Sequence, residues 1–254
     1  MKGCITGQPM LKQDAPMPRL LRIFSLCLGL GAAQIAPALA DSGTFDLSIR
    51  GLTAGVLQFS GSMEGKNYSV TGSLKSSGIA AMVRRVSFQA DTSGRYSGGR
   101  WQPARYREQA DTGKRTSQSL MEYKAGIPAE MLQESREGRA NYVDPATQGG
   151  TVDPLTALFA MLRDVPVAQA CQLNLTMFDG ARRSQIALDA AVTVDGAITC
   201  PGEYRRLKGF SDKEMAEKQS FSFRVTYGPA DQGRVHVVTI AMDTLYGRAA
   251  LTRR

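Results

Sequence analysis

The stretch LQFSGSMEGKNYSVTGSL, residues 57–74, decides the fold class of this chain. Its apolar residues are Leu57, Phe59, Met63, Tyr68, Val70 and Leu74. They fall mostly at every second position, and this alternation is typical of β-strands that bury one face. Between the two runs, Glu64-Gly65-Lys66-Asn67 has the composition of a tight turn. The stretch therefore predicts an antiparallel hairpin.

The same alternation extends in both directions from this hairpin. Further runs contain Phe45, Leu47 and Ile49; Leu173, Leu175 and Met177; Ile186 and Leu188; Val192 and Val194; Phe221, Phe223, Val225 and Tyr227; Val235 and Val237. The dipeptides Ser93-Gly94, Asp179-Gly180 and Asp195-Gly196 are predicted turns. About nine to twelve strands are expected, which is too many for one flat sheet. We expect a single curled antiparallel sheet or a partly open β-barrel.

One segment, DPLTALFAMLR at residues 153–163, has helical periodicity instead. Asp153 can cap the helix and Pro154 suits its first turn. The apolar stripe consists of Leu155, Leu158, Phe159 and Leu162. This spacing predicts one amphipathic helix packed across the sheet, facing its core or a cavity. The sequence leaves open whether the helix is a fixed plug or a mobile lid.

Two weaker helical stretches lie at residues 78–85 and 211–218. In the second, Ser211 and Glu214 have the spacing of a capping box. The second stretch is charged throughout, so we expect an exposed insertion between strands.

Residues 1–40 have the pattern of a cleavable export signal. Arg19 and Arg22 precede an apolar core, and small residues precede a cleavage site between Ala40 and Asp41. Translation starting at Met17 would give a more compact signal. We therefore expect a bacterial periplasmic protein whose residues 41–254 form a single antiparallel β domain. No later run is apolar for the roughly 20 residues that a transmembrane helix needs.

Four cysteines occur in the chain, and two of them, Cys4 and Cys27, leave with the predicted signal. Cys171 and Cys200 remain in an oxidising compartment, where a disulfide between them is expected. Closing a loop of about 30 residues stabilises a fold by roughly 3 to 4 kcal/mol in the chain-entropy model.

The net charge of +8 arises from 31 basic and 23 acidic residues. The basic residues form scattered pairs and no long run, which disfavours a nucleic-acid-binding protein. Lipid headgroups and anionic polysaccharide are the more plausible acidic partners in the cell envelope.

Motifs of known catalytic sites are missing from the sequence after residue 40. His236 is the single histidine, and strand alternation places it on the solvent face, so mechanisms that need histidine have little support. Several carboxylates precede glycine or proline, where turn formation explains them. We expect no enzymatic activity, no cofactor and no metal site. The aromatic residues that could line a cavity, or equally pack in the core, are Tyr96, Trp101, Tyr106 and Tyr123.

The sequence resembles the domain of unknown function 3108 family over most of residues 44–250. The motifs that carry the resemblance are DPLTALF at 153–159, Cys171, FDGARR at 178–183, CPGEYR at 200–205 and Gly209-Phe210. The resemblance implies an exported bacterial protein with a curled antiparallel β domain, and it implies no known activity. The charged stretch 211–218 does not match the family pattern closely.

Two functions follow from this architecture. A curled sheet with a helix across it can enclose a cavity for one hydrophobic or lipid-like envelope molecule, by analogy of fold with half-barrel lipoprotein carriers. Alternatively, an exposed strand edge or the basic surface docks onto another cell-envelope protein. An outer-membrane barrel is disfavoured because aromatic residues are too sparse for the girdles of that class.

Overall fold

The computed structural model describes residues 39–131, 140–245 and 247–254. Within them the chain forms a 15-stranded sheet. The strands are β1 (Leu39–Ile49), β2 (Leu52–Glu64), β3 (Asn67–Ser76), β4 (Ser87–Ser97), β5 (Arg100–Asp111), β6 (Thr116–Lys124), β7 (Ile127–Met131), β8 (Val165–Pro166), β9 (Asn174–Phe178), β10 (Arg183–Leu188), β11 (Val192–Val194), β12 (Ala197–Lys208), β13 (Ser220–Pro229), β14 (Arg234–Thr244) and β15 (Gly247–Arg253). The helices are α1 (Gly78–Val83), α2 (Pro154–Leu162) and α3 (Asp212–Glu217), with short 3-10 turns at Pro145–Thr147, Val167–Gln169 and Asp231–Gly233.

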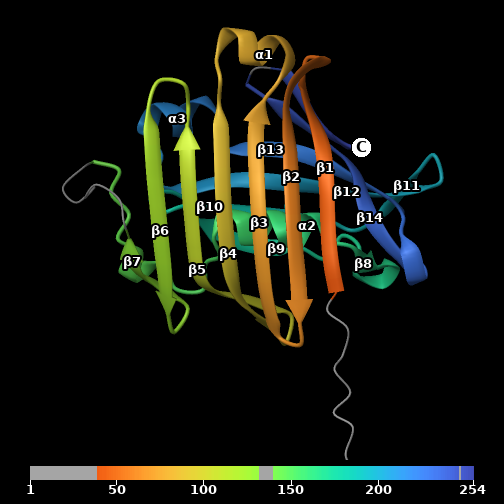
Figure 1. Ribbon diagram of the computed structural model, residues 1–254, viewed down its shortest axis with the longest axis horizontal. Coiled ribbons are helices and arrows are strands. Elements are labelled where there is room, and N and C mark those ends of the chain that lie inside the picture. The colour runs from red at the N-terminus through yellow and green to blue at the C-terminus, as the bar shows by residue number, and fades with distance from the viewer. Residues whose placement is uncertain (1–38, 132–139, 246) are drawn as a thin grey trace, which may run out of the picture. The chain divides into compact units, whose positions relative to one another are not determined.

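The strands follow one continuous path, and nearly every neighbour pair is antiparallel and close in sequence (Figure 1). The path runs β7-β6-β5-β4-β3-β2-β1-β15-β14-β13-β12-β10-β9, while β11 pairs with β12 and β8 with β14. Its one long-range step is the pairing of β1 with β15, in which Phe45 lies opposite Arg253. The ends of the described chain therefore meet inside the sheet.

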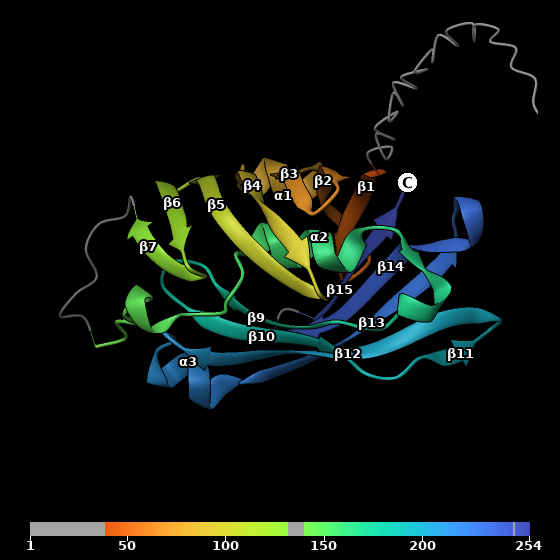
Figure 2. The ribbon, with the colours of Figure 1, turned by 90° about the horizontal axis from the view of Figure 1, so that it is seen from below.

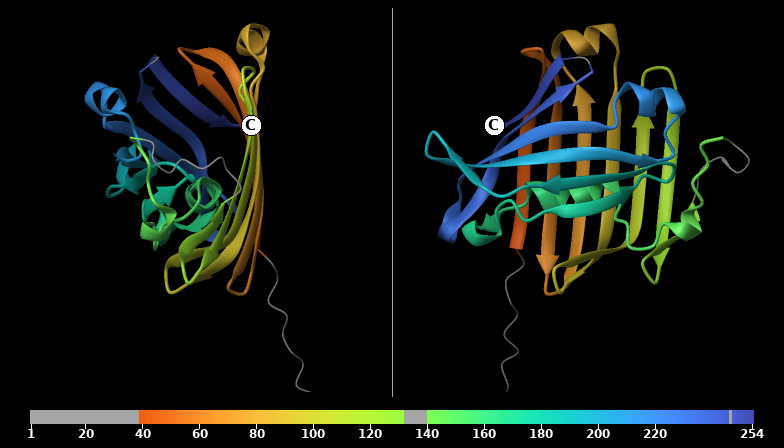
Figure 3. Two further views of the ribbon diagram at one scale, coloured as in Figure 1. Left: turned by 90° about the vertical axis from the view of Figure 1, so that its left-hand side faces the viewer. Right: turned by 180° about the vertical axis from the view of Figure 1, so that it is seen from behind.

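The sheet curls so that its two halves face each other with α2 between them (Figures 2 and 3). The helix contacts β3, β4 and β5 on one side and β9 and β14 on the other. The prediction of a mainly β fold is confirmed, and of the two predicted forms the structure shows an open antiparallel sheet, on which α2 packs. The expected number of about nine to twelve strands was too low. Two of the strands that alternation did not identify, β8 with 2 residues and β7 with 5, are too short to show it clearly.

One predicted turn was wrong, because Ser93-Gly94 lies inside β4. The pairing of β4 with β5 shifts register between Ser93 and Gly94, as at a β-bulge. A Cβ atom on Gly94 would lie 2.4 Å from the Gln102 carbonyl oxygen. Glycine is needed here for close approach between strands. The predicted turns at Gly65-Lys66 and Asp195-Gly196 are confirmed.

Helix α2 begins as the sequence predicts. The Asp153 side chain accepts a hydrogen bond from the Thr156 backbone N–H at 2.8 Å, and Pro154 occupies the first turn. The helix is buried on nearly all sides and not along one stripe. Its buried residues are Leu155, Thr156, Ala157, Phe159, Ala160, Met161 and Leu162, whereas Leu158 is half-buried. The amphipathic pattern fails because the curled sheet covers the helix from two directions.

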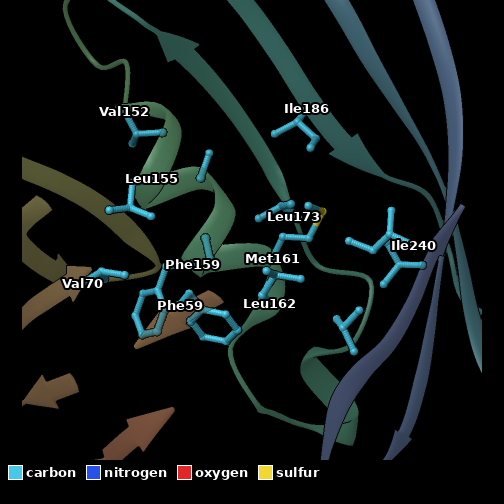
Figure 4. Close-up of a cluster of buried hydrophobic side chains, with 14 of the residues drawn as sticks. Phe59, Val70, Val152, Leu155, Phe159, Met161, Leu162, Leu173, Ile186 and Ile240 are labelled. Atoms are coloured by element: carbon cyan, nitrogen blue, oxygen red, sulfur yellow. The ribbon is translucent and has the colours of Figure 1, made fainter. Parts of the chain in front are cut away.

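Large apolar side chains from both halves of the sheet meet on α2 (Figure 4). Phe59 and Val70 approach from one half, and Ile186 and Ile240 belong to the other. A strand glycine permits the closest contact, since a Cβ on Gly61 would lie 2.4 Å from the Phe159 ring. Helix and sheet therefore pack at a distance that only glycine allows at this position.

The Cys171–Cys200 disulfide is present, with Cα atoms 5.4 Å apart and both residues buried. It joins the segment before β9 to β12. Helices α1 and α3 confirm the two weaker helical predictions, and Ser211 and Glu214 form the complete capping box. The predicted export signal falls on residues 1–40, of which 1–38 lie outside the described residues. Ala40 and Asp41 belong to β1.

The segment before α2 connects the two ends of the strand path. The Gly150 N–H donates to the Gly126 carbonyl, in the turn before β7, at 3.0 Å. Val152 then forms a parallel bridge with Met177 of β9. Part of the β9 edge is therefore already hydrogen-bonded within the chain.

Candidate functional site

An apolar pocket of about 390 Å³ lies between the inner face of the sheet and the first turns of α2. The sheet contributes Leu47, Leu57, Gly72, Ser73, Leu74, Phe88, Ala90, Tyr106, Glu108 and Leu251, and the helix contributes Pro154, Leu155 and Leu158. Leu74 and Phe88 are register partners on either side of the connection that contains α1. The pocket therefore lies toward the strand ends that carry α1.

Polar groups are few in the lining of this pocket and belong to Ser73, Tyr106 and Glu108. The Tyr106 hydroxyl donates a 2.6 Å hydrogen bond to Glu108 Oε2. Burial and the adjacent Glu108 carboxylate together raise the pKa of Tyr106 above its ordinary value, so this phenol stays protonated. Such a lining favours a ligand that is mainly hydrocarbon, with room for one polar contact.

A buried polar network fixes α2 beside the pocket. Asp153 is fully buried, and its Oδ2 atom accepts hydrogen bonds from Thr92 at 2.9 Å and Thr156 at 2.6 Å. The Tyr68 hydroxyl lies 2.9 Å from Thr156 Oγ1. Because Tyr68 and Thr92 belong to β3 and β4, the network joins the start of the helix to one half of the sheet. These hydrogen bonds hold the start of α2 on this side, and apolar side chains pack against the helix on the other.

A second pocket, of about 320 Å³, lies near the C-terminal end of α2. It is lined by Tyr96, Gly99, Ala160, Met161, Arg163, Val165, Gln169, Gln172, Leu173, Leu188 and Tyr227. The Arg163 guanidinium carbon lies 5.6 Å from the ring centroids of both Tyr96 and Trp101. Its Nε is buried without a hydrogen-bond partner among the described residues, and burial lowers the pKa of Arg163. This pocket offers cation–π contacts and hydrogen-bond donors, in contrast to the apolar pocket.

The predicted cleavage site, between Ala40 and Asp41, lies near Arg163 and Arg234. Asp41 is buried, and its Oδ1 atom is 3.6 Å from Nη2 of Arg234. Burial raises the pKa of Asp41, whereas Arg234 acts in the opposite direction. Arg234 also donates a hydrogen bond to the Asp164 carbonyl oxygen. The first residue of the predicted mature chain is thus part of the folded sheet.

The structure separates the predicted site residues into two groups. Leu155 and Leu158 line the apolar pocket, whereas Phe159 and Leu162 are fully buried in the core. The cysteine pair does not line the apolar pocket, and His236 is half-buried between the buried Val235 and Val237 of β14.

The aromatic residues divide in the same way. Tyr106 lines the apolar pocket and Tyr96 lines the second one, while Trp101 packs on Tyr68, Tyr96 and Phe159. The Tyr123 hydroxyl is buried without a hydrogen-bond partner among the described residues.

Sequence reasoning missed Phe88 and Leu251 as pocket residues and Thr92 as a partner of Asp153. The alternation of Phe88 with Ala90 and Thr92 was the available signal for β4. Nothing comparable marks Leu251, because its neighbours in the sequence AALTR do not alternate clearly.

In the described ranges, no group of three or more His, Cys, Asp and Glu side chains is arranged to hold a metal ion. None of the helices in the same ranges combines the length and apolar character needed to cross a bilayer.

Similar proteins are found among solved structures and among sequence families. A crystal structure of a beta-barrel-like protein of domain of unknown function DUF1849 from Brucella abortus is similar, with a TM-score of 0.45 and 12% sequence identity over 87% of this chain and 96% of that chain. No curated protein matches the sequence. The family model described as protein of unknown function (DUF3108) matches residues 44–247, which is most of the chain. The predicted resemblance is confirmed, and the chain belongs to the DUF3108 family.

Proposed function

We propose that this protein is an exported, non-enzymatic binding module that holds a hydrophobic or lipid-like molecule of the cell envelope in its apolar pocket. The observation that carries the proposal is the lining of the pocket, which is nearly all aliphatic and aromatic. Its volume of about 390 Å³ lies within the range of roughly 300 to 1,000 Å³ that is typical of small-molecule sites. The proposed location is the bacterial periplasm.

The burial of the helix residues beside the pocket supports the binding of a ligand there. Leu155 is buried, but Leu158, one helical turn further on, is only half-buried and borders the pocket. An alkyl chain lying along Leu74 and Phe88 would cover Leu158 and remove apolar surface from water. Each methylene group buried in this way contributes about 0.8 kcal/mol.

Native mass spectrometry of protein purified from the periplasm, followed by organic extraction, tests the proposal directly. A defined additional mass that extracts as a lipid is the expected result. Protein of the bare disulfide-bonded mass that also fails to take up an apolar fluorescent probe such as phenylnaphthylamine would contradict the proposal.

The variant Leu158→Trp tests whether the ligand binds in the apolar pocket. The indole would occupy the space beside Leu74, so probe binding should be lost while the denaturation midpoint stays close to that of the wild type. Val192→Trp is the matched control, because Val192 is exposed on β11 and lies outside the pocket. Equal probe binding by Leu158→Trp and the wild type would place the ligand elsewhere.

The alternative function is docking onto another envelope protein by addition of a strand to a sheet edge. The edges of the described path are β7 and β9. Val152 already occupies part of β9, and Pro128 in β7 removes one donor from that edge. These features favour the ligand-binding proposal over strand addition. Crosslinking in cells would reveal a partner at β7 if strand addition operates.

A further inference from the structure

We propose that the tip formed by α1 and its neighbouring turns docks this protein onto an anionic lipid surface. The tip consists of Leu52, α1 (Gly78–Val83), Arg84, Arg85 and the turn of residues 112–115. The inference rests on the proposed function, because it supplies the surface at which a lipid-like ligand would enter or leave.

The apolar side chains of the tip point outward. Met82 is 86% exposed and Val83 is 81% exposed, and Ile79 and Leu52 are also exposed. Ile79, Met82 and Val83 have the i, i+3, i+4 spacing that places them on one helical face. No residue of α1 is buried, so these side chains add nothing to the core. A patch of this kind marks an interaction surface.

The backbone of the tip is held in place although its side chains are exposed. The Ser77 N–H donates to the Ala54 carbonyl at 3.1 Å. The Ser76 hydroxyl donates to the Arg84 carbonyl at 3.2 Å and accepts from the Val86 N–H at 2.9 Å. These bonds fasten both ends of the α1 connection to β2 and β3. Helix α1 therefore lies at one end of the strands (Figure 1), with its backbone hydrogen-bonded to the sheet and its apolar side chains exposed.

Four exposed basic residues border the apolar face: Arg84, Arg85, Lys114 and Arg115. Lys114 and Arg115 belong to the turn between β5 and β6, and this turn packs on the arginines. A Cβ atom on Gly113 would lie 2.6 Å from the Arg85 carbonyl oxygen and 2.7 Å from Arg84 Cγ. None of the four basic side chains forms an ion pair with another described residue.

Apolar side chains bordered by exposed cations match the two layers of an anionic membrane surface. The apolar groups enter the boundary of the acyl chains, and the cations remain beside the phosphates. A protein partner would have to offer an apolar groove with an acidic rim. An anionic lipid surface supplies apolar chains and negative charge without a groove of matching shape. The apolar pocket lies toward the same strand ends, since Leu74 and Phe88 flank the α1 connection.

Co-sedimentation of the purified chain with vesicles tests this docking. Binding is expected to vesicles of phosphatidylcholine and phosphatidylglycerol in equal amounts, and it should weaken as salt is added. Vesicles of phosphatidylcholine alone should bind more weakly. Failure of the wild type to bind the mixed vesicles would overturn the proposal and favour a protein partner.

Variants test the apolar and the basic parts of this contact separately. The double variant Met82→Ser with Val83→Ser should bind mixed vesicles at least about tenfold more weakly. Arg84→Gln with Arg85→Gln should weaken that binding about thirtyfold and leave binding to neutral vesicles unchanged. The matched control is Val192→Ser with Val194→Ser, which removes two exposed apolar residues from β11. Wild-type binding by both tip variants, or equal loss in the control, would refute the tip as the docking surface.

Failure of this inference is distinguishable from failure of the proposed function. The tip variants should take up the apolar probe as the wild type does when no vesicles are present, because none of the substituted residues lines the pocket. Conversely, Leu158→Trp should lose the probe and still sediment with mixed vesicles. A tip variant that loses both activities with an unchanged denaturation midpoint would contradict the separation of tip and pocket.

Discussion

The Thr92 hydroxyl lies 2.9 Å from Asp153 Oδ2 and donates a hydrogen bond to it within the core. This bond links the middle of β4 to the N-cap residue of α2. Burial is the largest influence on Asp153 and raises its pKa to about 6, although hydrogen bonds from Thr156 and Thr92 act in the opposite direction. The carboxyl group that caps α2 therefore titrates near pH 6, above its ordinary range.

This shift predicts a pH dependence of stability. A carboxyl group with a raised pKa in the folded state binds its proton more tightly there, so its contribution is complete below the unfolded value of 3.8 and is lost as the pH rises through about 6. Asp153→Asn retains the cap and does not titrate. The unfolding free energy of the wild type relative to Asp153→Asn should fall by about 3 kcal/mol over this range. Urea denaturation at several pH values measures the difference.

Other titrating groups, including Asp41, are shared by the two proteins and cancel in this comparison. A difference that stays constant from pH 3 to pH 7 would show that Asp153 is not shifted by burial. Thr92→Val should give a second signature, because loss of the donor raises the pKa of Asp153 further.

Removal of the disulfide should destabilise the protein. Cys171 and Cys200 are 29 positions apart, and a closed loop of this size reduces the entropy of the unfolded chain. Replacing both cysteines with alanine should lower the unfolding free energy by roughly 3 to 4 kcal/mol. Denaturation of both proteins under oxidising conditions checks this value. Equal midpoints would exclude a stabilising bridge, and reduced wild-type protein provides the comparison without mutation.

Gly61→Ala should disturb the contact between sheet and helix. The added methyl group would lie 2.4 Å from Cε2 of Phe159, a fully buried ring with little room to move. Overpacking of this kind costs about 1 to 3 kcal/mol, which thermal or chemical denaturation can resolve. Ser69→Ala is the control, since Ser69 is exposed on the outward face of β3. An unchanged midpoint for Gly61→Ala would show that α2 can shift away from β2.

Export predicts a defined N-terminus. Signal peptidase selects small residues, and Ala38-Leu39-Ala40 supplies them before Asp41. Protein isolated from the periplasm should therefore begin at Asp41, as N-terminal sequencing would establish. An N-terminus at Met1 or Met17 would contradict the predicted signal.

Much of the fold follows from local patterns in the sequence. Alternation located the hairpin of residues 57–74, and capping residues located α2 at Asp153. These signals are local, so they can be recognised without knowing which distant segments pack against them. Ser93-Gly94 misled because turn and bulge glycines look alike in sequence, and only the carbonyl of Gln102 explains the residue.

The site was less predictable because it depends on contacts between distant segments. Periodicity identified Leu155 and Leu158, but Leu251 reaches the pocket only because β15 pairs with β1. The helix was predicted to be amphipathic because Leu155, Leu158, Phe159 and Leu162 form one stripe, which leaves Thr156 off that face. Thr156 is nevertheless fully buried, since its hydroxyl is satisfied by Asp153. Burial of a satisfied polar group cannot be deduced from periodicity.

The pairing of Phe45 with Arg253 has a consequence for how the sheet is completed. Hairpins such as β2–β3 can form as soon as their own residues are available, whereas β1 lacks one neighbour until the distant strand β15 is available to pair with it. Pairings between distant segments are the slow steps of folding. During folding, the edge of β1 that pairs with β15 therefore stays available to other chains until the seven residues of β15 join it.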